Sequence, residues 1–274
     1  MATTLRDRLR TLHPGASGRS VKQWLEAGRV RVNGLVVRRG DTPVGDADRV
    51  ELGAPPPPAF PAPLRLVHAD ADIVVIDKPP GLLTVADAGE RHRTAYRLLR
   101  DWVAAQGGAR IFVVHRLDRE TSGLLVFARS PEAKAMLQKQ FQLRTPERVY
   151  QARVEGVVRE DEGTLTARLV EDRSLRIRQT RDTERGREAI TRYRVLARYA
   201  DATLLELRLV TGRRGQIRAQ LAARGHPIVG DRAYGSRRDP FKRVCLHATR
   251  LGFSHPDGYR ATFESAPPSA FRRP

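Results

Sequence analysis

The sequence predicts an α+β protein whose main domain is a mixed, largely antiparallel β-sheet with flanking helices, preceded by a small α/β domain. Alternating apolar and polar residues at Gln151–Val157, Ala189–Leu196 and Ala202–Val210 are typical of long strands with one buried face. Helical spacing at Thr94–Ala105, and at Pro131–Phe141 with proline in the first turn, predicts helices that pack on the sheet. A proline-rich interruption nearer the N-terminus separates the two domains.

The interruption lies at residues 53–63, where six of the eleven residues are proline. Proline has no backbone N–H to donate to a β-ladder, so this run cannot join the interior of a sheet. At 274 residues the chain is long enough for one large and one small domain. We therefore expect a small domain at residues 1–52, an extended linker at 53–63 and the main domain at 64–274.

The small domain is predicted to contain two helices and a hairpin. Apolar spacing indicates helices over Thr4–Leu12 and Ser20–Ala27. Asn33-Gly34 is a strong signal for a two-residue hairpin turn, and Asp48–Leu52 supplies a third extended segment. The hairpin strands are expected at Arg29–Val32 and Leu35–Arg38.

The charge of the chain indicates a polyanionic partner. Fifty Lys and Arg against 31 Asp and Glu give a formal net charge of +19, for which nucleic acid is the first candidate and a membrane surface the second. No apolar run approaches the ~20 residues that span a bilayer, so we expect no membrane segment and a cytoplasmic protein. A single cysteine, Cys245, fits a reducing compartment, and seven scattered His predict no metal site.

The candidate catalytic residue lies in a polar turn. Two apolar runs, Ile111–Val114 and Leu124–Phe127, bracket a segment that carries Asp118. Arg116 and Arg119 flank this carboxylate and are expected to keep it ionised. Thr121 and Ser122 offer hydroxyls that are expected to cap the turn, and Gly123 permits a tight backbone. On these residues alone, a structural turn cap is the more common role for such an Asp.

The run from His115 to Leu125 resembles the signature of the RluA-type family of RNA pseudouridine synthases. That signature is His-Arg-Leu-Asp, two free positions, then Thr-Ser-Gly-Leu-Leu, and this chain meets it at every fixed position. The resemblance implies that the chain isomerises uridine to pseudouridine in RNA and that Asp118 is the essential carboxylate. Because the reaction involves no oxidation or reduction, no cofactor is expected.

A second segment, Arg148-Val149-Tyr150, is similar to the family's motif of a basic residue and a tyrosine two apart on one strand face. The resemblance implies that Tyr150 packs on the target base and is a candidate for accepting the proton. Arg148 stands where lysine is usual, which keeps the charge and changes the hydrogen-bond geometry. Without the resemblance, Tyr150 is more often a half-buried strand residue.

A third segment, Thr211–Leu221, is similar to a motif whose arginine pairs with the catalytic aspartate. Arg218 matches that arginine, which stays charged at any relevant pH. Taken alone, it would more often be an arginine on an exposed helix. The chain departs from the motif at Gly215 and Gln220, where the family usually has histidines.

The small domain resembles the S4 RNA-binding domain. Its pattern is carried by Trp24, Gly28, Val30, Val32, Asn33, Gly34, Asp46 and Val50. Six basic residues are candidate phosphate contacts, although for any one of them an ordinary solvated surface position competes equally. They are Arg6, Arg10, Arg19, Lys22, Arg29 and Arg31.

Together these segments predict an RNA pseudouridine synthase that acts on large-subunit ribosomal RNA as a monomer. The alternatives are a synthase that acts on transfer RNA, and a non-catalytic RNA-binding or ribosome-assembly factor on the same scaffold. A DNA-binding protein ranks last, since no recognition-helix or zinc motif is present. Besides Asp118, Tyr150 and Arg218, the residues expected to contact the substrate are Arg116, Leu117, Arg148, Arg213, Gln216 and Leu221.

Overall fold

A computed structural model describes residues 3–55, 58–108, 110–172 and 176–272. The chain divides into two compact units, Met1–Ala59 and Phe60–Pro274, and the division falls inside the proline-rich run. None of the helices in these described ranges is long and apolar enough to cross a membrane.

The first unit packs two short helices against short strands. Helix α1 (Leu5–Leu12) is capped by Thr4, whose side chain accepts a hydrogen bond from the backbone of Asp7. Helix α2 (Gly18–Glu26) begins two residues earlier than predicted because Ser17 caps it by accepting from Ser20 N. The strands are β1 (Thr3–Thr4), β2 (Val30–Val32), β3 (Leu35–Val36), β4 (Pro43–Val44) and β5 (Val50–Leu52). Their small core holds Leu5, Leu9, Val21, Leu25, Val30 and Val44.

The predicted hairpin is present between β2 and β3. Asn33 has φ 52° and Gly34 has φ 83°, which is the left-handed pair that a tight two-residue hairpin turn requires. Val32 pairs with Leu35, and β5 pairs with the other edge of β2. The turn is held further by Asn33, whose Nδ2 donates to Asp48 Oδ1 at 2.7 Å.

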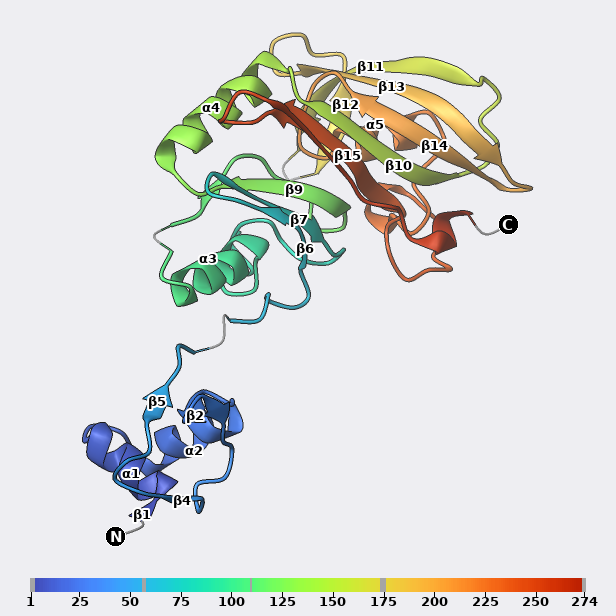
Figure 1. The fold of residues 1–274 in the computed structure, drawn as a ribbon. Helices are drawn as coiled ribbons and strands as arrows, with labels where there is room; N and C mark the ends of the chain where they lie inside the picture. The colour runs from blue at the N-terminus through green and yellow to red at the C-terminus, as the bar shows by residue number, and fades with distance from the viewer. Residues whose placement is uncertain (1–2, 56–57, 109, 173–175, 273–274) are drawn as a thin grey trace. The chain divides into compact units, whose positions relative to one another are not determined.

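The second unit is built on one large sheet, as predicted (Figure 1). The sheet order in the described residues is β12-β11-β13-β14-β10-β15-β9-β7-β6, with β16 paired to β15 and β8 to β9. All pairs are antiparallel except β15 with β9. The strands are β6 (Arg65–Ala69), β7 (Ile73–Lys78), β8 (Phe112–Val113), β9 (Ser122–Ala128), β10 (Glu147–Glu155), β11 (Glu162–Glu171), β12 (Ile177–Thr180), β13 (Arg187–Arg198), β14 (Ala202–Leu209), β15 (Leu246–Ser254) and β16 (Arg260–Glu264).

Helices cover both faces of this sheet. The helical elements are α3 (Ala95–Ala105), α4 (Pro131–Leu143), α5 (Gln216–Ala223), η1 (Arg232–Tyr234) and η2 (Ser269–Arg272). Leu99 of α3 and Ile217 of α5 share one apolar core, which includes alternate residues of β7 and β9. Leu137 of α4 belongs to a separate core formed by the intervening residues of the same strands. Strands β7 and β9 are therefore buried on both faces, which explains their continuous apolar runs.

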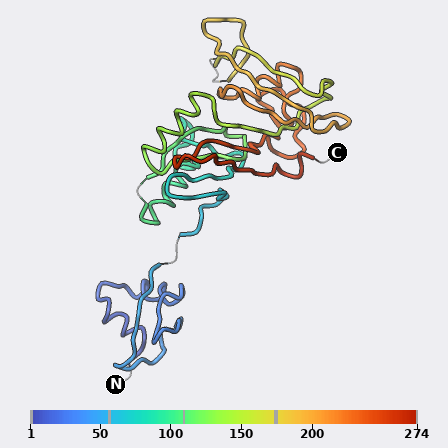
Figure 2. Tube along the Cα trace, turned by 45° about the horizontal axis from the view of Figure 1, so that its top comes forward, coloured from blue at the N-terminus to red at the C-terminus, as the bar shows by residue number. Residues whose placement is uncertain are grey.

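The early strands of this unit form one end of the sheet, the strands β11–β14 form the other, and the late strand β15 lies between them. Figure 2 shows β6, β7 and β9 on one side and β11, β13 and β14 on the other, with β10 and β15 between them. The sequence analysis does not predict β11 or β12, although β11 carries the alternation of its neighbours, with Leu165 and Leu169 buried. The strand expected at Ile111–Val114 is shorter, and β8 holds only Phe112 and Val113.

Candidate active site

A cavity of about 910 Å³ opens where the loop between β8 and β9, strand β10 and the start of α5 meet. Its lining includes Asp118, Tyr150 and Arg218, which come from segments far apart in the sequence. The fold therefore brings together the three residues that the sequence predicts as catalytic. A space of this volume is within the range of small-molecule sites in proteins.

Asp118 and Arg218 are in contact in this cavity. Asp118 Oδ2 lies 3.8 Å from Arg218 Nη1, and the two side chains are 21% and 13% exposed. In the described part of the chain, neither Arg116 nor Arg119 forms an ion pair with Asp118. Arg119 Nε instead donates to Gly81 O at 3.2 Å. The cation that contacts the carboxylate is thus supplied by α5 and not by the flanking arginines that the sequence suggested.

The backbone around Asp118 is fixed by a buried threonine that the sequence analysis missed. Thr84 Oγ1 accepts from Leu117 N at 3.1 Å and donates to Leu117 O at 2.9 Å. On the other side of the carboxylate, Thr121 N donates to Asp118 O at 3.1 Å. Asp118 is therefore held by its own turn and by a distant segment, and no local signal marks Thr84.

A buried lysine links the same turn to the loop that follows β7. Lys78 is fully buried, and its Nζ donates to the carbonyls of Pro79, Leu82 and Arg119 at 2.9, 2.8 and 3.2 Å. Burial lowers its pKa from 10.5 to about 7, although the charges of Glu120 and Asp118 oppose the shift. The sequence signal was present, since Lys78 ends an apolar strand, but a lysine at that position is usually solvated.

The Ser122 hydroxyl, which was expected to cap the turn, binds elsewhere. The Ser122 hydroxyl lies 2.8 Å from His247 Nδ1 and accepts from Arg243 Nη2 at 2.6 Å, so it contacts the C-terminal part of the sheet. The expectation for Ser122 was therefore wrong. Gly123 has φ 111°, and a Cβ there would collide with the backbone of Ala248. The glycine is required where β9 and β15 approach each other.

Arg218 is oriented by an aspartate on the far side of its guanidinium. Arg218 Nε and Nη2 donate to Asp231 Oδ2 and Oδ1, each at 2.7 Å, and the Tyr234 ring lies 4.7 Å from the guanidinium carbon. Burial works to lower the pKa of Arg218, but the hydrogen bonds and charge of Asp231 outweigh it and raise the pKa. The sequence analysis did not identify Asp231, which comes 13 residues later in an irregular segment.

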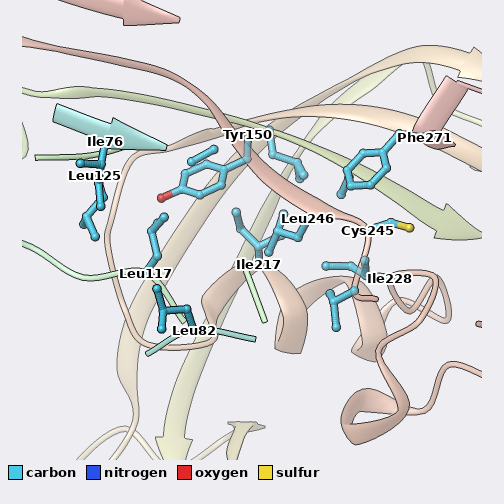
Figure 3. Close-up of a cluster of buried hydrophobic side chains, with 14 of the residues drawn as sticks. Ile76, Leu82, Leu117, Leu125, Tyr150, Ile217, Ile228, Cys245, Leu246 and Phe271 are labelled. Atoms are coloured by element: carbon cyan, nitrogen blue, oxygen red, sulfur yellow. The ribbon is translucent and has the colours of Figure 1, made fainter. Parts of the chain in front are cut away.

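Tyr150 forms part of the apolar wall of the cavity. Figure 3 shows its ring on β10, with Leu117, Ile217 and Leu246 around it and its hydroxyl directed toward the side where Leu117 and Leu125 lie. Burial raises its pKa to about 12, with the positive charge of Arg148 opposing the shift. The phenol is therefore protonated at neutral pH, which suits stacking better than proton abstraction.

Five of the six predicted substrate-contacting residues line the cavity. They are Arg116, Leu117, Arg148, Arg213 and Gln216. Leu221 was predicted wrongly: it is buried in the core and lines a separate cavity of about 360 Å³ with Tyr193 and Leu205. Leu221 lies one helical turn after Ile217, and only the first turn of α5 borders the larger cavity.

The side chain of Gln216 is fully occupied by protein contacts. Its Oε1 accepts from Thr211 Oγ1 and Arg213 N at 2.8 and 3.0 Å. Its Nε2 donates to Ile190 O and Thr191 Oγ1 at 3.0 and 2.8 Å. Gln216 therefore fixes the turn that leads into α5 and has no free amide hydrogen for a substrate.

The two departures from the family motif have structural roles. Gly215 precedes α5 with φ 58°, and a Cβ there would lie 2.8 Å from the Tyr234 hydroxyl. Gln220 is fully buried, and its Nε2 donates to Leu165 O and Ala189 O, each at 2.9 Å. Its Oε1 accepts from Thr191 Oγ1 at 2.7 Å. Gln220 therefore ties α5 to β11 and β13.

The sequence analysis predicted no metal site, but the structure places Asp72, His255 and Asp257 with their ligand atoms within 4.8 Å of one another. The two nitrogens of His255 already have protein partners. Its Nε2 lies 3.2 Å from Asp70 Oδ2, and Nδ1 accepts from Asp257 N at 3.1 Å. The group is thus explained by hydrogen bonding within the fold.

In the first unit, the six candidate phosphate contacts differ in their surroundings. Lys22 pairs with Glu26 at 3.8 Å. Arg29 donates to Gly53 O at 3.0 Å and is only partly exposed. The other four are at the surface of the unit, at Arg6, Arg10, Arg19 and Arg31.

Comparisons with known proteins place the chain among proteins of one family. Residues 72–223 match the family model described as RNA pseudouridylate synthase. The chain is 40% identical to the dual-specificity RNA pseudouridine synthase RluA of Pasteurella multocida over 78% of this chain and 96% of that protein. It is 33% identical to the ribosomal large subunit pseudouridine synthase D of Haemophilus ducreyi over 90% of this chain and 82% of that protein.

Solved structures show the same fold. Human RNA pseudouridylate synthase domain containing 4 superposes with a TM-score of 0.64 at 22% identity, over 76% of this chain and 90% of that one. Human RNA pseudouridylate synthase domain containing 1 has the same TM-score and identity over 79% of this chain and 89% of that one.

Proposed function

The chain belongs to the RNA pseudouridine synthase family, and we propose that it isomerises a specific uridine of large-subunit ribosomal RNA with Asp118 as the essential carboxylate. The ribosomal substrate is supported by the relative from Haemophilus ducreyi, whose name states that it acts on the large ribosomal subunit. The non-catalytic alternative is not favoured, since Asp118, Tyr150 and Arg218 line one cavity.

The reaction needs few groups. The bond between C1′ and N1 of the uridine breaks, the base turns, and a bond forms between C1′ and C5. C5 loses its proton and N1 gains one, so the atoms and the charge balance without an oxidant or reductant. Asp118 attacks or assists departure of the base, and the Arg218 guanidinium contacts and orients the carboxylate. Tyr150 provides the surface on which the base stacks.

The observation that carries this assignment is the contact of Asp118 with Arg218 inside a cavity beside an aromatic wall. The target uridine must leave its RNA context to reach such a cavity. A carboxylate in this cavity, paired with an arginine that is itself held by Asp231, is pre-organised for reaction at a single nucleotide.

The first unit supplies further contacts to RNA in this proposal. Its order of two helices and a hairpin resembles the S4 domain, and four arginines at its surface are available for phosphates. A monomer is proposed because one chain supplies all three groups of the site. The cytoplasm is the proposed compartment, since it contains ribosomal RNA.

Mapping of pseudouridine tests the proposal directly. Total RNA is taken from cells that lack the gene and from cells that carry the wild type or Asp118→Asn, and pseudouridines are located by carbodiimide labelling and sequencing. We expect one ribosomal uridine to lose its mark on deletion and to regain it only with the wild type. If the changed site lies in transfer RNA, the proposed substrate is wrong and the proposed activity stands. If no site changes in any RNA, the proposed activity is contradicted.

A further inference from the structure

Arg148 is a buried cation without an anionic partner in the described structure. The residue is 8% exposed, and its Nε and Nη2 are buried with no hydrogen-bond partner among the described residues. Buried charges in proteins are normally paired, because an unpaired charge away from water costs several kcal/mol. An exception on the wall of a substrate cavity indicates a group that binds there.

The surroundings of Arg148 are cationic or neutral. The guanidinium carbon lies 5.8 Å from the centre of the Phe141 ring. Burial lowers the pKa of Arg148, Tyr150 opposes this, and the charge of Arg144 adds to it. Burial, together with the charge of Arg148, lowers the pKa of His115 to about 3, so that histidine is neutral. Among the described residues, no carboxylate acts on the charge of Arg148. The surroundings of Arg148 therefore favour the binding of an anion.

A glycine, Gly212, leaves room for the guanidinium of Arg148. A Cβ at Gly212 would collide with Arg148 Nη1, so with any other residue at that position the end of the arginine side chain would have to shift. Arg213, the next residue, and Arg144 line the same cavity. Arg144 is close enough for its charge to act on Arg148, and Arg213 adds a further positive charge to the lining.

We propose that Arg148, with Arg144 and Arg213, forms a phosphate subsite that binds the RNA backbone beside the target uridine. Arg148 and Tyr150 both line the cavity and are two residues apart on β10, roughly 7 Å along the strand. A phosphate at Arg148 would therefore lie close to a base stacked on Tyr150. The planar guanidinium offers parallel N–H donors that match two phosphate oxygens. The proposal rests on RNA being the substrate, as proposed above.

The melting temperature of the RNA-free protein distinguishes an Arg148 that binds phosphate from an Arg148 that only stabilises the fold. Replacing Arg148 by methionine removes the cost of burying the charge, so the RNA-free protein should keep or increase its melting temperature. A residue that served only the fold would show the opposite effect. The same substitution removes the phosphate partner, so RNA binding should weaken while the fold is preserved.

The test compares Arg148→Met with Arg208→Met. Arg208 pairs in register with Val149 on the neighbouring strand, is 52% exposed, and forms surface ion pairs with Glu206 and Glu147. It does not line the cavity, so its substitution removes one positive charge and leaves the proposed subsite intact. Turnover is followed by release of tritium from C5 of labelled uridine, using an RNA that the wild type modifies.

For Arg148→Met we expect KM to rise roughly tenfold to a hundredfold, with kcat little changed. The slope of log KM against log salt should fall by about 0.7–0.9, the value for one phosphate contact. Arg208→Met should change neither KM nor the melting temperature. An unchanged KM with a lower melting temperature would assign Arg148 to the fold. If kcat fell while KM did not change, the charge of Arg148 would act on the reacting base and not on a phosphate. That result would contradict the phosphate subsite.

A second measurement does not depend on the identity of the RNA. Inorganic phosphate is titrated into the wild type, Arg148→Met and Arg208→Met, and the melting temperature is recorded. We expect the wild type and Arg208→Met to gain more than Arg148→Met at each concentration, because a bound anion stabilises the folded state. Equal gains in all three proteins would contradict the subsite even if pseudouridine mapping confirms the activity.

Discussion

Arg218 bridges two carboxylates, with both bonds to Asp231 at 2.7 Å and a longer contact to Asp118 at 3.8 Å. The tighter pair is the one away from the cavity, since Asp231 is 1% exposed and Asp118 is half-buried. Asp231 thus fixes the plane of the guanidinium and leaves Nη1 for Asp118. The position of Asp118, the carboxylate proposed to react, thus depends on a residue that does not line the cavity.

Asp231→Asn should lower kcat by roughly a hundredfold, because Arg218 loses the partner that orients it toward Asp118. KM should change much less, since Asp231 does not line the cavity. The measurement is a full rate curve at a temperature where the variant is folded, as shown by circular dichroism. Asp161→Asn, which removes an 86% exposed carboxylate paired with Arg198, is the matched control and should be unaffected. An equal loss in both variants would exclude a specific role for Asp231.

Substitutions at Tyr150 separate stacking from proton transfer. Tyr150→Phe keeps the ring, so the affinity for RNA should be little changed, whereas Tyr150→Ala should lose about 1–3 kcal/mol of binding free energy. The pKa of about 12 implies that no ionisation of Tyr150 shapes the rate between pH 7 and 10. A rate that rises through pH 9–10 in the wild type and not in Tyr150→Phe would show that the phenolate acts as a base. Fluorescence anisotropy and a pH–rate profile provide the two readouts.

The sequence predicts most of the large sheet and the candidate carboxylate Asp118 because both are encoded in contiguous segments. Strand alternation and the 11 residues from His115 to Leu125 need no information from elsewhere in the chain. The fold class and the helices α3 and α4 follow in the same way and are confirmed. The proposed roles of Asp118, Tyr150 and Arg218 stay predictions that the geometry supports.

The residues that position the site could not be predicted, because their roles arise from contacts between distant segments. Thr84 meets Leu117 across 33 positions, and Ser122 meets His247 across 125. A threonine or a serine has no distinctive local pattern, so Thr84 was missed and Ser122 was placed wrongly in the turn. Leu221 was misassigned for a related reason, since the sequence does not show which turn of a helix borders a cavity.

Gly215 should be intolerant of alanine for two separable reasons. Its φ of 58° costs a non-glycine residue about 1–2 kcal/mol, and a Cβ would also press on the Tyr234 hydroxyl, whose ring packs on Arg218. Gly225 has φ 80°, and a Cβ added there would meet nothing within 4 Å, so Gly225→Ala carries the backbone cost alone. We expect Gly215→Ala to lose more unfolding free energy in urea than Gly225→Ala, and to lose more kcat as well. Equal activities would show that Tyr234 adjusts without moving Arg218.

Lys78 should make the stability of the protein depend on pH above neutrality. Its pKa is about 7 when folded and near 10.5 when unfolded, so between these values the unfolded chain binds one more proton. The stability of the wild type relative to Lys78→Met should therefore increase with pH, by up to about 1.4 kcal/mol per unit between pH 7 and 10. Below pH 7 the lysine is charged in both states, and the difference should become constant. The loss of three hydrogen bonds to carbonyls in Lys78→Met adds an offset that does not vary with pH. Urea unfolding of both proteins from pH 6 to 10 measures the slope, and parallel curves would show that Lys78 stays charged in the folded protein.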